Sequence, residues 1–150
     1  MKVMVREYLP EDFEKIEKIH DAARKEELRF AKLQQAFLPF SVAAERENFF
    51  DYKICTAILY GKVVGFAAYS EDELAWLYVD SAYFRRGIGR ALVEYVLAHT
   101  SRPVWVEVLS GNVPAESLYH SVGFEKSEIC SGKMPGNEKF PVTVIRLCLK

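Results

Sequence analysis

The chain has 150 residues, of which 50% are hydrophobic and 27% charged, a balance that excludes intrinsic disorder and fits a single domain spanning residues 1–150. Its 20 lysines and arginines nearly cancel its 21 aspartates and glutamates, which argues against a nucleic-acid partner. The widely spaced Cys55, Cys130 and Cys148 are interpreted as reduced thiols. Because no apolar run reaches about 18 residues, we expect a cytoplasmic protein without a membrane partner.

The N-terminal segment changes from strand to helix periodicity within a dozen residues. Residues 2–9 alternate apolar and polar side chains, which predicts a strand, and Pro10 then favours a helix start. Phe13, Ile16 and His20 recur at helical spacing and predict an apolar helix face, on which we interpret His20 as a packed side chain.

The next segment is less regular. Residues 27–40 lose the helical period, which predicts a bent or irregular connection and a candidate binding loop. Ser41 is a good N-cap residue and predicts a short second helix that runs toward Phe49. Residues 53–59, 62–70 and 74–80 are then rich in β-branched and aromatic side chains and predict an antiparallel meander.

The second half of the chain alternates helices and strands. Helical spacing returns over residues 87–99, followed by a strand at 104–109 and a helix at about 113–122. Two further strands are predicted at 124–130 and 142–149, separated by a segment rich in turn formers. The order βααβββαβαββ predicts an α/β (α+β) fold: a mixed, mostly antiparallel central sheet of about seven strands flanked by about four helices.

A glycine-rich turn between a strand and a helix indicates an anion site. Gly87 and Gly89 open the helix, whose first backbone N–H groups and dipole attract a phosphate. Arg85, Arg86 and Arg90 add positive charge there. The segment matches neither the Walker A pattern nor the dinucleotide fingerprint, which would need a third glycine at Leu92.

A second segment, residues 106–125, carries polar groups in an apolar setting. Glu107 interrupts an apolar strand, where a carboxylate is costly unless it is solvated, paired or used, and partial burial would suit it as a base. Asn112 follows in a loop, and Tyr119 lies on the next helix, so that one ligand could contact both.

Together the two segments resemble the acyl-CoA-binding signatures of the GNAT superfamily, N-acyltransferases that use acetyl-CoA. The first block is RRGIGRA after a strand, and the second fits N-x-x-A-x-x-x-Y-x-x-x-G-F at Asn112, Ala115, Tyr119, Gly123 and Phe124. The resemblance spans most of the chain and implies the GNAT fold. One position departs from the family, because Phe84 replaces the usual Gln or Arg three residues before the first glycine; we expect the adjacent Arg85 to compensate.

The resemblance also implies roles for individual residues. It implies that the pyrophosphate of the co-substrate is held by the backbone of Arg85, Arg86, Gly87, Ile88, Gly89, Arg90 and Ala91. It implies that Leu77, Tyr78 and Val79 present main-chain groups to the pantetheine arm where their strand splays from the strand at 104–109. Asn112 and Ala115 would line the other side, and Tyr119 would protonate the departing thiolate. The base would be Glu107, with Glu71, Asp72, Glu73 or a water-mediated route as alternatives.

The expected reaction is direct transfer of an acetyl group from acetyl-CoA to a primary amine in a ternary complex, without a metal. The acceptor is expected to be a small molecule or a peptide or protein amine. A catalytically silent acyl-CoA sensor of the same fold is the first alternative, and a plain phosphate or nucleotide binder is the second. A homodimer is also expected, with residues 142–150 as the partner edge.

Overall fold

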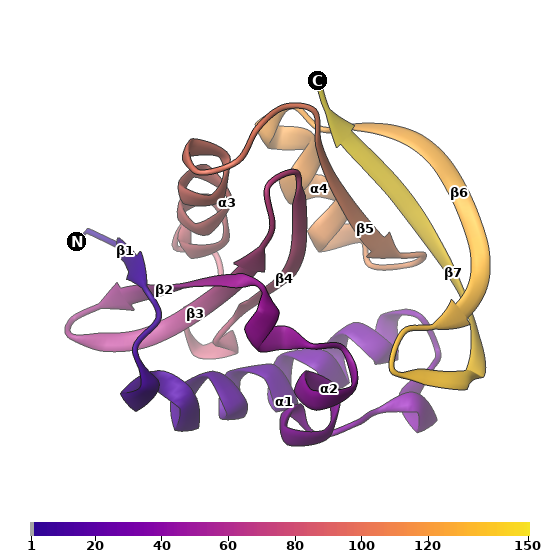
Figure 1. Cartoon of the computed structure of the whole chain (residues 1–150), viewed down its shortest axis with the longest axis horizontal. Coiled ribbons are helices and arrows are strands. Elements are labelled where there is room, and N and C mark those ends of the chain that lie inside the picture. The colour runs from indigo at the N-terminus through magenta and orange to yellow at the C-terminus, as the bar shows by residue number, and fades with distance from the viewer. Residues whose placement is uncertain (1) are drawn as a thin grey trace.

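A seven-stranded sheet forms the centre of the computed structural model, which describes residues 2–150 (Figure 1). The strands are β1 (Met4–Glu7), β2 (Lys53–Leu59), β3 (Lys62–Tyr69), β4 (Glu73–Val79), β5 (Val104–Leu109), β6 (Glu125–Met134) and β7 (Asn137–Leu149), in the spatial order β1-β2-β3-β4-β5-β7-β6. Neighbours are antiparallel except for β4 and β5, which are parallel. The predicted mixed sheet and element order are confirmed.

Helices cover both faces of the sheet (Figure 1). They are α1 (Phe13–Phe30), α2 (Phe40–Arg46), α3 (Ile88–Ala98) and α4 (Val113–Val122). The apolar sides of α1 and α2 pack on one face, and those of α3 and α4 pack on the other. Because both faces are covered, β2 and β3 are buried along almost their whole length, which explains their continuous apolar sequences.

The segment between α1 and β2 differs from the prediction. The first helix continues through Phe30, and only residues after it form the irregular connection. Helix α2 starts at Phe40 with Pro39 at its N-cap position, so the prediction that Ser41 caps it is wrong. The fully buried Phe40 ring packs against the rings of Phe49 and Trp76. We attribute the earlier start to this burial.

The turn-rich segment before the last strand is also more regular than predicted. Strands β6 and β7 extend to Met134 and Asn137, so that only Pro135 and Gly136 form the turn of a long hairpin. Gly136 supplies the left-handed φ of +75° that the turn requires. Pro141 is tolerated inside β7 because β5 pairs only with the later part of that strand, from Val144 onward.

The edge strands of the sheet are not the ones expected to form the dimer contact. Strand β7 lies between β5 and β6, so residues 142–150 do not form a free edge, contrary to the prediction. The two edge strands are β1 and β6. The homodimer itself stays a prediction. In the described part of the chain, no helix combines the length and apolar character needed to cross a membrane.

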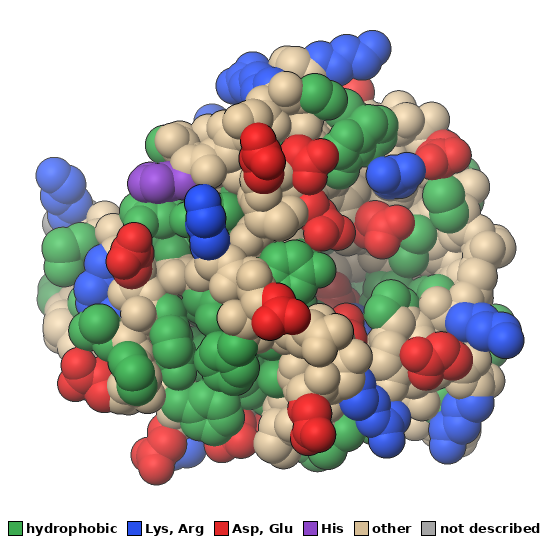
Figure 2. All heavy atoms as spheres, viewed as in Figure 1, with side chains coloured by type: hydrophobic (Ala, Val, Ile, Leu, Met, Phe, Trp, Pro, Cys, Tyr) green, Lys and Arg blue, Asp and Glu red, His purple; other side chains and the backbone are tan. Residues whose placement is uncertain are grey.

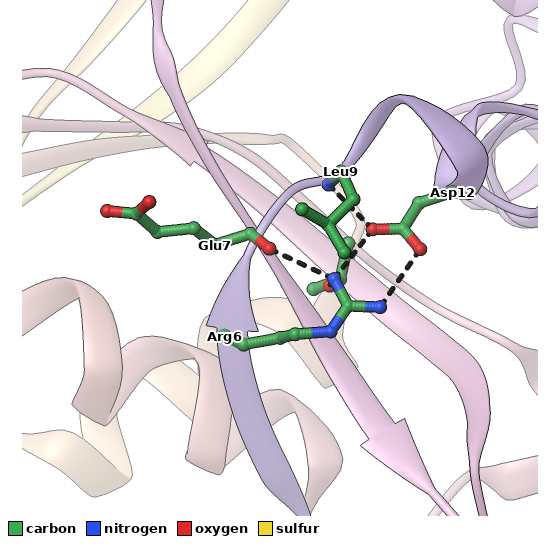
Figure 3. A network of polar contacts seen from close by, with 5 residues as sticks. Arg6, Glu7, Leu9 and Asp12 are labelled. Carbon is green, nitrogen blue, oxygen red and sulfur yellow. Dashed lines mark hydrogen bonds and ion pairs between the residues drawn. The ribbon is translucent and has the colours of Figure 1, made fainter.

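A polar network fastens β1 to the start of α1 (Figure 3). Arg6 donates two hydrogen bonds to the buried carboxylate of Asp12, with N···O distances of 2.8 and 3.0 Å, and the backbone N–H of Leu9 donates a third at 2.9 Å. Arg6 also reaches Thr56 on β2. Burial alone would raise the pKa of Asp12, but the hydrogen bonds from Arg6 and Leu9 outweigh it and hold that pKa below its usual value.

We expect the substitution Asp12→Asn to lower the free energy of unfolding by about 2 kcal/mol at pH 7, because it leaves Arg6 and the Leu9 amide without their charged acceptor. A carboxylate with a lowered folded-state pKa stabilises the fold above its unfolded pKa of about 4, and that contribution is lost as the pH falls through the folded pKa. Urea unfolding should therefore show a difference from wild type at pH 7 that shrinks in acid. The exposed neighbour provides the control, since Glu11→Gln should change little.

Candidate active site

Strands β4 and β5 separate soon after they meet. Their ladder contains only the pairs Glu73–Trp105 and Leu74–Val106, although both strands continue beyond them (Figure 1). From Trp76 to Val79, β4 keeps its partner β3 but has no strand on its other edge. The backbone groups of this edge are therefore open to a ligand, as the sequence resemblance implies.

A groove of about 700 Å³ opens at this separation. It is lined by most of the predicted site residues, namely Leu77, Tyr78, Val79, Arg85, Gly87, Ile88, Gly89, Arg90, Glu107, Asn112, Ala115 and Tyr119. Two predicted residues lie elsewhere: Ala91 is outside the lining, and the Arg86 guanidinium packs over the ring of Tyr83. The two sequence blocks, separated by residues 92–111, thus meet across one groove.

The start of α3 forms one end of the groove. Gly87 is the N-cap residue, with a left-handed φ of +77°, and no side chain caps the helix. A Cβ on Gly87 would meet no atom within 4 Å, so the approach to the first amides of the helix is open. Arg85 and Arg90 line the same end, and this combination of N–H groups, dipole and positive charge suits a phosphate group. Phe84, the position that departs from the family, also lines the groove.

Helix α4 contributes the opposite wall. Asn112 caps the helix by accepting a hydrogen bond from the Ala115 N–H at 3.3 Å, so its side chain has a structural role as well as a place in the lining. Tyr119 is 5% exposed and packs edge-on against Phe124. Burial, with a smaller contribution from the charge of Glu27, raises the pKa of Tyr119 well above its usual value. Its hydroxyl therefore stays protonated near neutral pH.

Among the predicted bases, Glu107 is the one that lines the groove. Its side chain is exposed rather than partly buried, because it projects from β5 on the side opposite Val106 and Val108, which enter the core. Glu71, Asp72 and Glu73 lie at the start of β4 and do not line the groove. Position therefore favours Glu107 over these alternatives.

Behind the separated strands lies a second cavity of about 150 Å³, which we call the chamber. Its walls come from α1, the end of α2, β4, β5 and the β6–β7 hairpin. Two hydrogen bonds hold the tip of that hairpin: Asn137 Nδ2 donates to the Ala36 carbonyl and Arg46 donates to the Gly136 carbonyl, each at 3.0 Å. The hairpin and the α1–α2 connection thus form one wall of the chamber.

The chamber carries an excess of negative charge. Glu27, Glu47 and Glu107 line it, against the single guanidinium of Arg24. Burial raises the pKa of Glu47 to about 7, with Arg24 acting against this rise and Glu27 and Glu138 adding to it. Figure 2 shows a hollow near the centre of the face that carries α2 and the hairpin, with acidic side chains gathered around it. This environment favours a cation.

Three of these charged residues, Arg24, Glu27 and Glu47, are not among the site residues predicted from the sequence. Arg24 and Glu27 share a helix face three residues apart, a spacing equally common on solvated helices, so no local signal distinguishes them. In the described residues, no group of three or more His, Cys, Asp or Glu is arranged to hold a metal ion.

We expect Gly87→Ala to weaken acetyl-CoA binding about tenfold, because a side chain strains the left-handed turn that presents the first amides of α3. Calorimetric titration with acetyl-CoA measures this change. Gly61→Ala is a matched control, since Gly61 has a φ of +74° and equal free space but lies in the β2–β3 turn, away from the groove. Both variants should lose about 1 kcal/mol of stability; equal acetyl-CoA affinities would contradict the assignment of the α3 turn.

The fold and groove define an acyltransferase-type domain, and comparison with known proteins identifies the family. The family model for the acetyltransferase (GNAT) domain matches residues 44–126, more than half of the chain. The chain therefore belongs to the GNAT acetyltransferase family, which confirms the resemblance drawn from RRGIGRA and the Asn112–Phe124 block.

The chain is also similar to individual curated proteins and solved structures. The chain is 34% identical over 93 residues to the UPF0157 protein YqkA of Bacillus subtilis, covering 58% of this chain and 26% of that protein. It is 35% identical over 77 residues to the ribosomal-protein-alanine N-acetyltransferase of Escherichia coli, covering 46% and 52%. The matches thus span about half or less of these relatives. The fold resembles that of the protein YncA from Salmonella typhimurium, solved with its cofactor acetyl-CoA, with a TM-score of 0.69, 18% identity and coverage of 99% of this chain and 93% of that chain.

Proposed function

We propose that this protein transfers the acetyl group of acetyl-CoA to a primary amine by direct attack within a ternary complex. The observation that carries the proposal is that two cavities meet at the β4–β5 separation. One is the groove, whose end at the start of α3 suits a phosphate group, and the other is the acidic chamber. A thioester in the groove and an amine in the chamber would approach each other from opposite sides of this opening.

The groove suits acetyl-CoA in shape and chemistry. The N-terminus of α3, with Arg85 and Arg90, would hold the pyrophosphate. The free edge of β4 at Leu77 to Val79 would hydrogen-bond the amide groups of the pantetheine arm, and the apolar side chains of Leu118 and Ile88 would cover its methylene groups. A backbone N–H of this edge would also polarise the thioester oxygen.

The proposed chemistry needs one base and one acid. The amine nitrogen forms a bond to the thioester carbonyl carbon, the carbon–sulfur bond breaks, and the electron pair leaves with sulfur. Glu107, at the junction of the cavities, would accept the proton that the amine loses, and Tyr119 would donate its hydroxyl proton to the thiolate. No cysteine is among the described residues that line either cavity, and burial raises the pKa of Cys55 to about 12. These facts support direct transfer over a covalent intermediate.

Calorimetry with acetyl-CoA, CoA and ADP, followed by thiol release in the presence of a panel of primary amines, tests the proposal. Acetyl-CoA should bind more tightly than ADP, and at least one amine should accelerate thiol release. Equal affinities for acetyl-CoA and ADP would instead support a nucleotide binder. Tight acetyl-CoA binding without amine-dependent thiol release would support a catalytically silent sensor.

A further inference from the structure

Five residues line both the groove and the chamber: Glu27, Ala75, Trp76, Tyr78 and Glu107. Only two of them carry a carboxylate, and these come from different elements, Glu27 from α1 and Glu107 from β5. The proposed reaction assigns Glu107 to the proton transfer and gives Glu27 no role. Its position at the junction therefore calls for a separate explanation.

Two hydrogen bonds to one of its oxygens hold the Glu27 carboxylate in a fixed orientation. Oε1 accepts a hydrogen bond from Arg24 Nη1 at 2.6 Å and another from the Tyr78 hydroxyl at 2.8 Å. Both donors are themselves constrained, because Tyr78 belongs to β4 and Arg24 lies one helical turn before Glu27 on α1. The second oxygen, Oε2, has no hydrogen-bond partner within the described chain. A positioned carboxylate with one free oxygen is suited to accept a hydrogen bond from a ligand.

The charge of Glu27 also acts on the groove side of the junction. Burial is the main reason that the pKa of Tyr119, on helix α4, is raised, and the charge of Glu27 is the second. The charge of Glu27 also raises the pKa of Tyr78. Glu27 therefore lies within electrostatic reach of the hydroxyl assigned to the departing sulfur. A cation bound at Glu27 would lie where the chamber meets the groove.

We infer that Glu27 is a binding residue for the acceptor, whose ammonium group donates a hydrogen bond to the free Oε2 while Arg24 and Tyr78 hold the carboxylate in place. This inference rests on the proposed function, and it names a ligand class. A cavity of about 150 Å³ holds roughly six non-hydrogen atoms, so the part of the acceptor within the chamber is a primary ammonium group on a short aliphatic segment. Glu27 would fix the nitrogen, and Glu107 would then remove its proton.

The probe for this inference is n-butylammonium, titrated into the complex of the protein with CoA and followed by NMR chemical shifts. CoA carries no acetyl group, so binding is measured without turnover. We expect saturable binding to wild type, at least tenfold weaker binding to Glu27→Gln, and a smaller loss in Tyr78→Phe, which keeps the carboxylate but removes one of the bonds that orient it. Glu14→Gln, an exposed position on the same helix outside both cavities, should change the affinity less than twofold.

A second probe separates a hydrogen bond from a general effect of charge. Tetramethylammonium has the same charge and the same atomic composition as n-butylammonium but no N–H donor, so it should bind more weakly than n-butylammonium, and Glu27→Gln should affect it less. Absence of n-butylammonium binding to the wild-type CoA complex, or equal binding to wild type and Glu27→Gln, would overturn the inference. If Glu27→Gln does not fold, as circular dichroism would show, an unchanged affinity in Tyr78→Phe overturns it. Failure of wild type to bind CoA would contradict the proposed function instead.

Discussion

The substitution Tyr119→Phe is expected to lower kcat about 100-fold while leaving the affinity for acetyl-CoA unchanged. The change removes only the hydroxyl, so the ring keeps its edge-on contact with Phe124 and the fold keeps its stability. Without the hydroxyl the departing thiolate has no positioned proton donor. Steady-state thiol release and calorimetry with acetyl-CoA measure the two quantities separately.

The pH profile adds a second expectation for Tyr119. Because burial and Glu27 raise its pKa well above the usual value, the hydroxyl should remain a proton donor up to at least pH 10, and the wild-type rate should show no loss from its ionisation below that pH. Tyr95→Phe is the matched control, since Tyr95 lies on α3 outside the groove and stacks on His99. A kcat for Tyr119→Phe within threefold of wild type would remove this residue from the acid role.

The substitution Glu107→Gln is expected to lower kcat/KM about 100-fold near neutral pH, because the amide retains the shape of the side chain but cannot accept the proton of the amine. The deficit should decrease as the pH rises toward the pKa of the acceptor, since more of the amine is then already neutral. A pH series of thiol release at fixed acetyl-CoA measures this trend.

Glu71→Gln provides the control for Glu107. Glu71 was an alternative base in the sequence, but it lies exposed before β4 and lines neither cavity, so its replacement should leave the rate unchanged. A loss of activity in Glu71→Gln together with normal activity in Glu107→Gln would reverse the assignment. Loss in neither variant would favour a route through water or through another group at the junction.

The sequence predicted the elements best where their signals are local. Local periodicity, together with the glycine and asparagine residues next to them, predicts a strand at 104–109 and a helix at 113–122. The structure has both elements with these bounds. The helix start at Phe40 and the β6–β7 hairpin depart from local signals, because burial of an aromatic ring and strand pairing outweigh the preferences of Ser41, Pro141 and their neighbours.

The candidate site divides in the same way. Most of the residues that line the groove lie within 77–90 and 106–119, so their pattern is visible before the fold is known, whereas those from α1 are not. The chamber residues are far apart in sequence: Glu27 and Tyr78 are 51 residues apart, and their hydrogen bond depends on the packing of α1 against β4. The exposure of Glu107 likewise depends on which face of β5 is covered. Such relations follow only from the assembled structure.

The parting of β4 and β5 has a consequence for the mechanics of the molecule. Among the described strands, the pairs Glu73–Trp105 and Leu74–Val106 are the only ones that join the backbone of β1 to β4 with that of β5 to β7. The sheet thus consists of two groups of strands that are paired over a short distance. An extended ligand would lie in the rest of the gap between β4 and β5. A ligand hydrogen-bonded along Leu77 to Val79 would act as an additional strand and would supply the backbone pairing that β5 does not give to this part of β4.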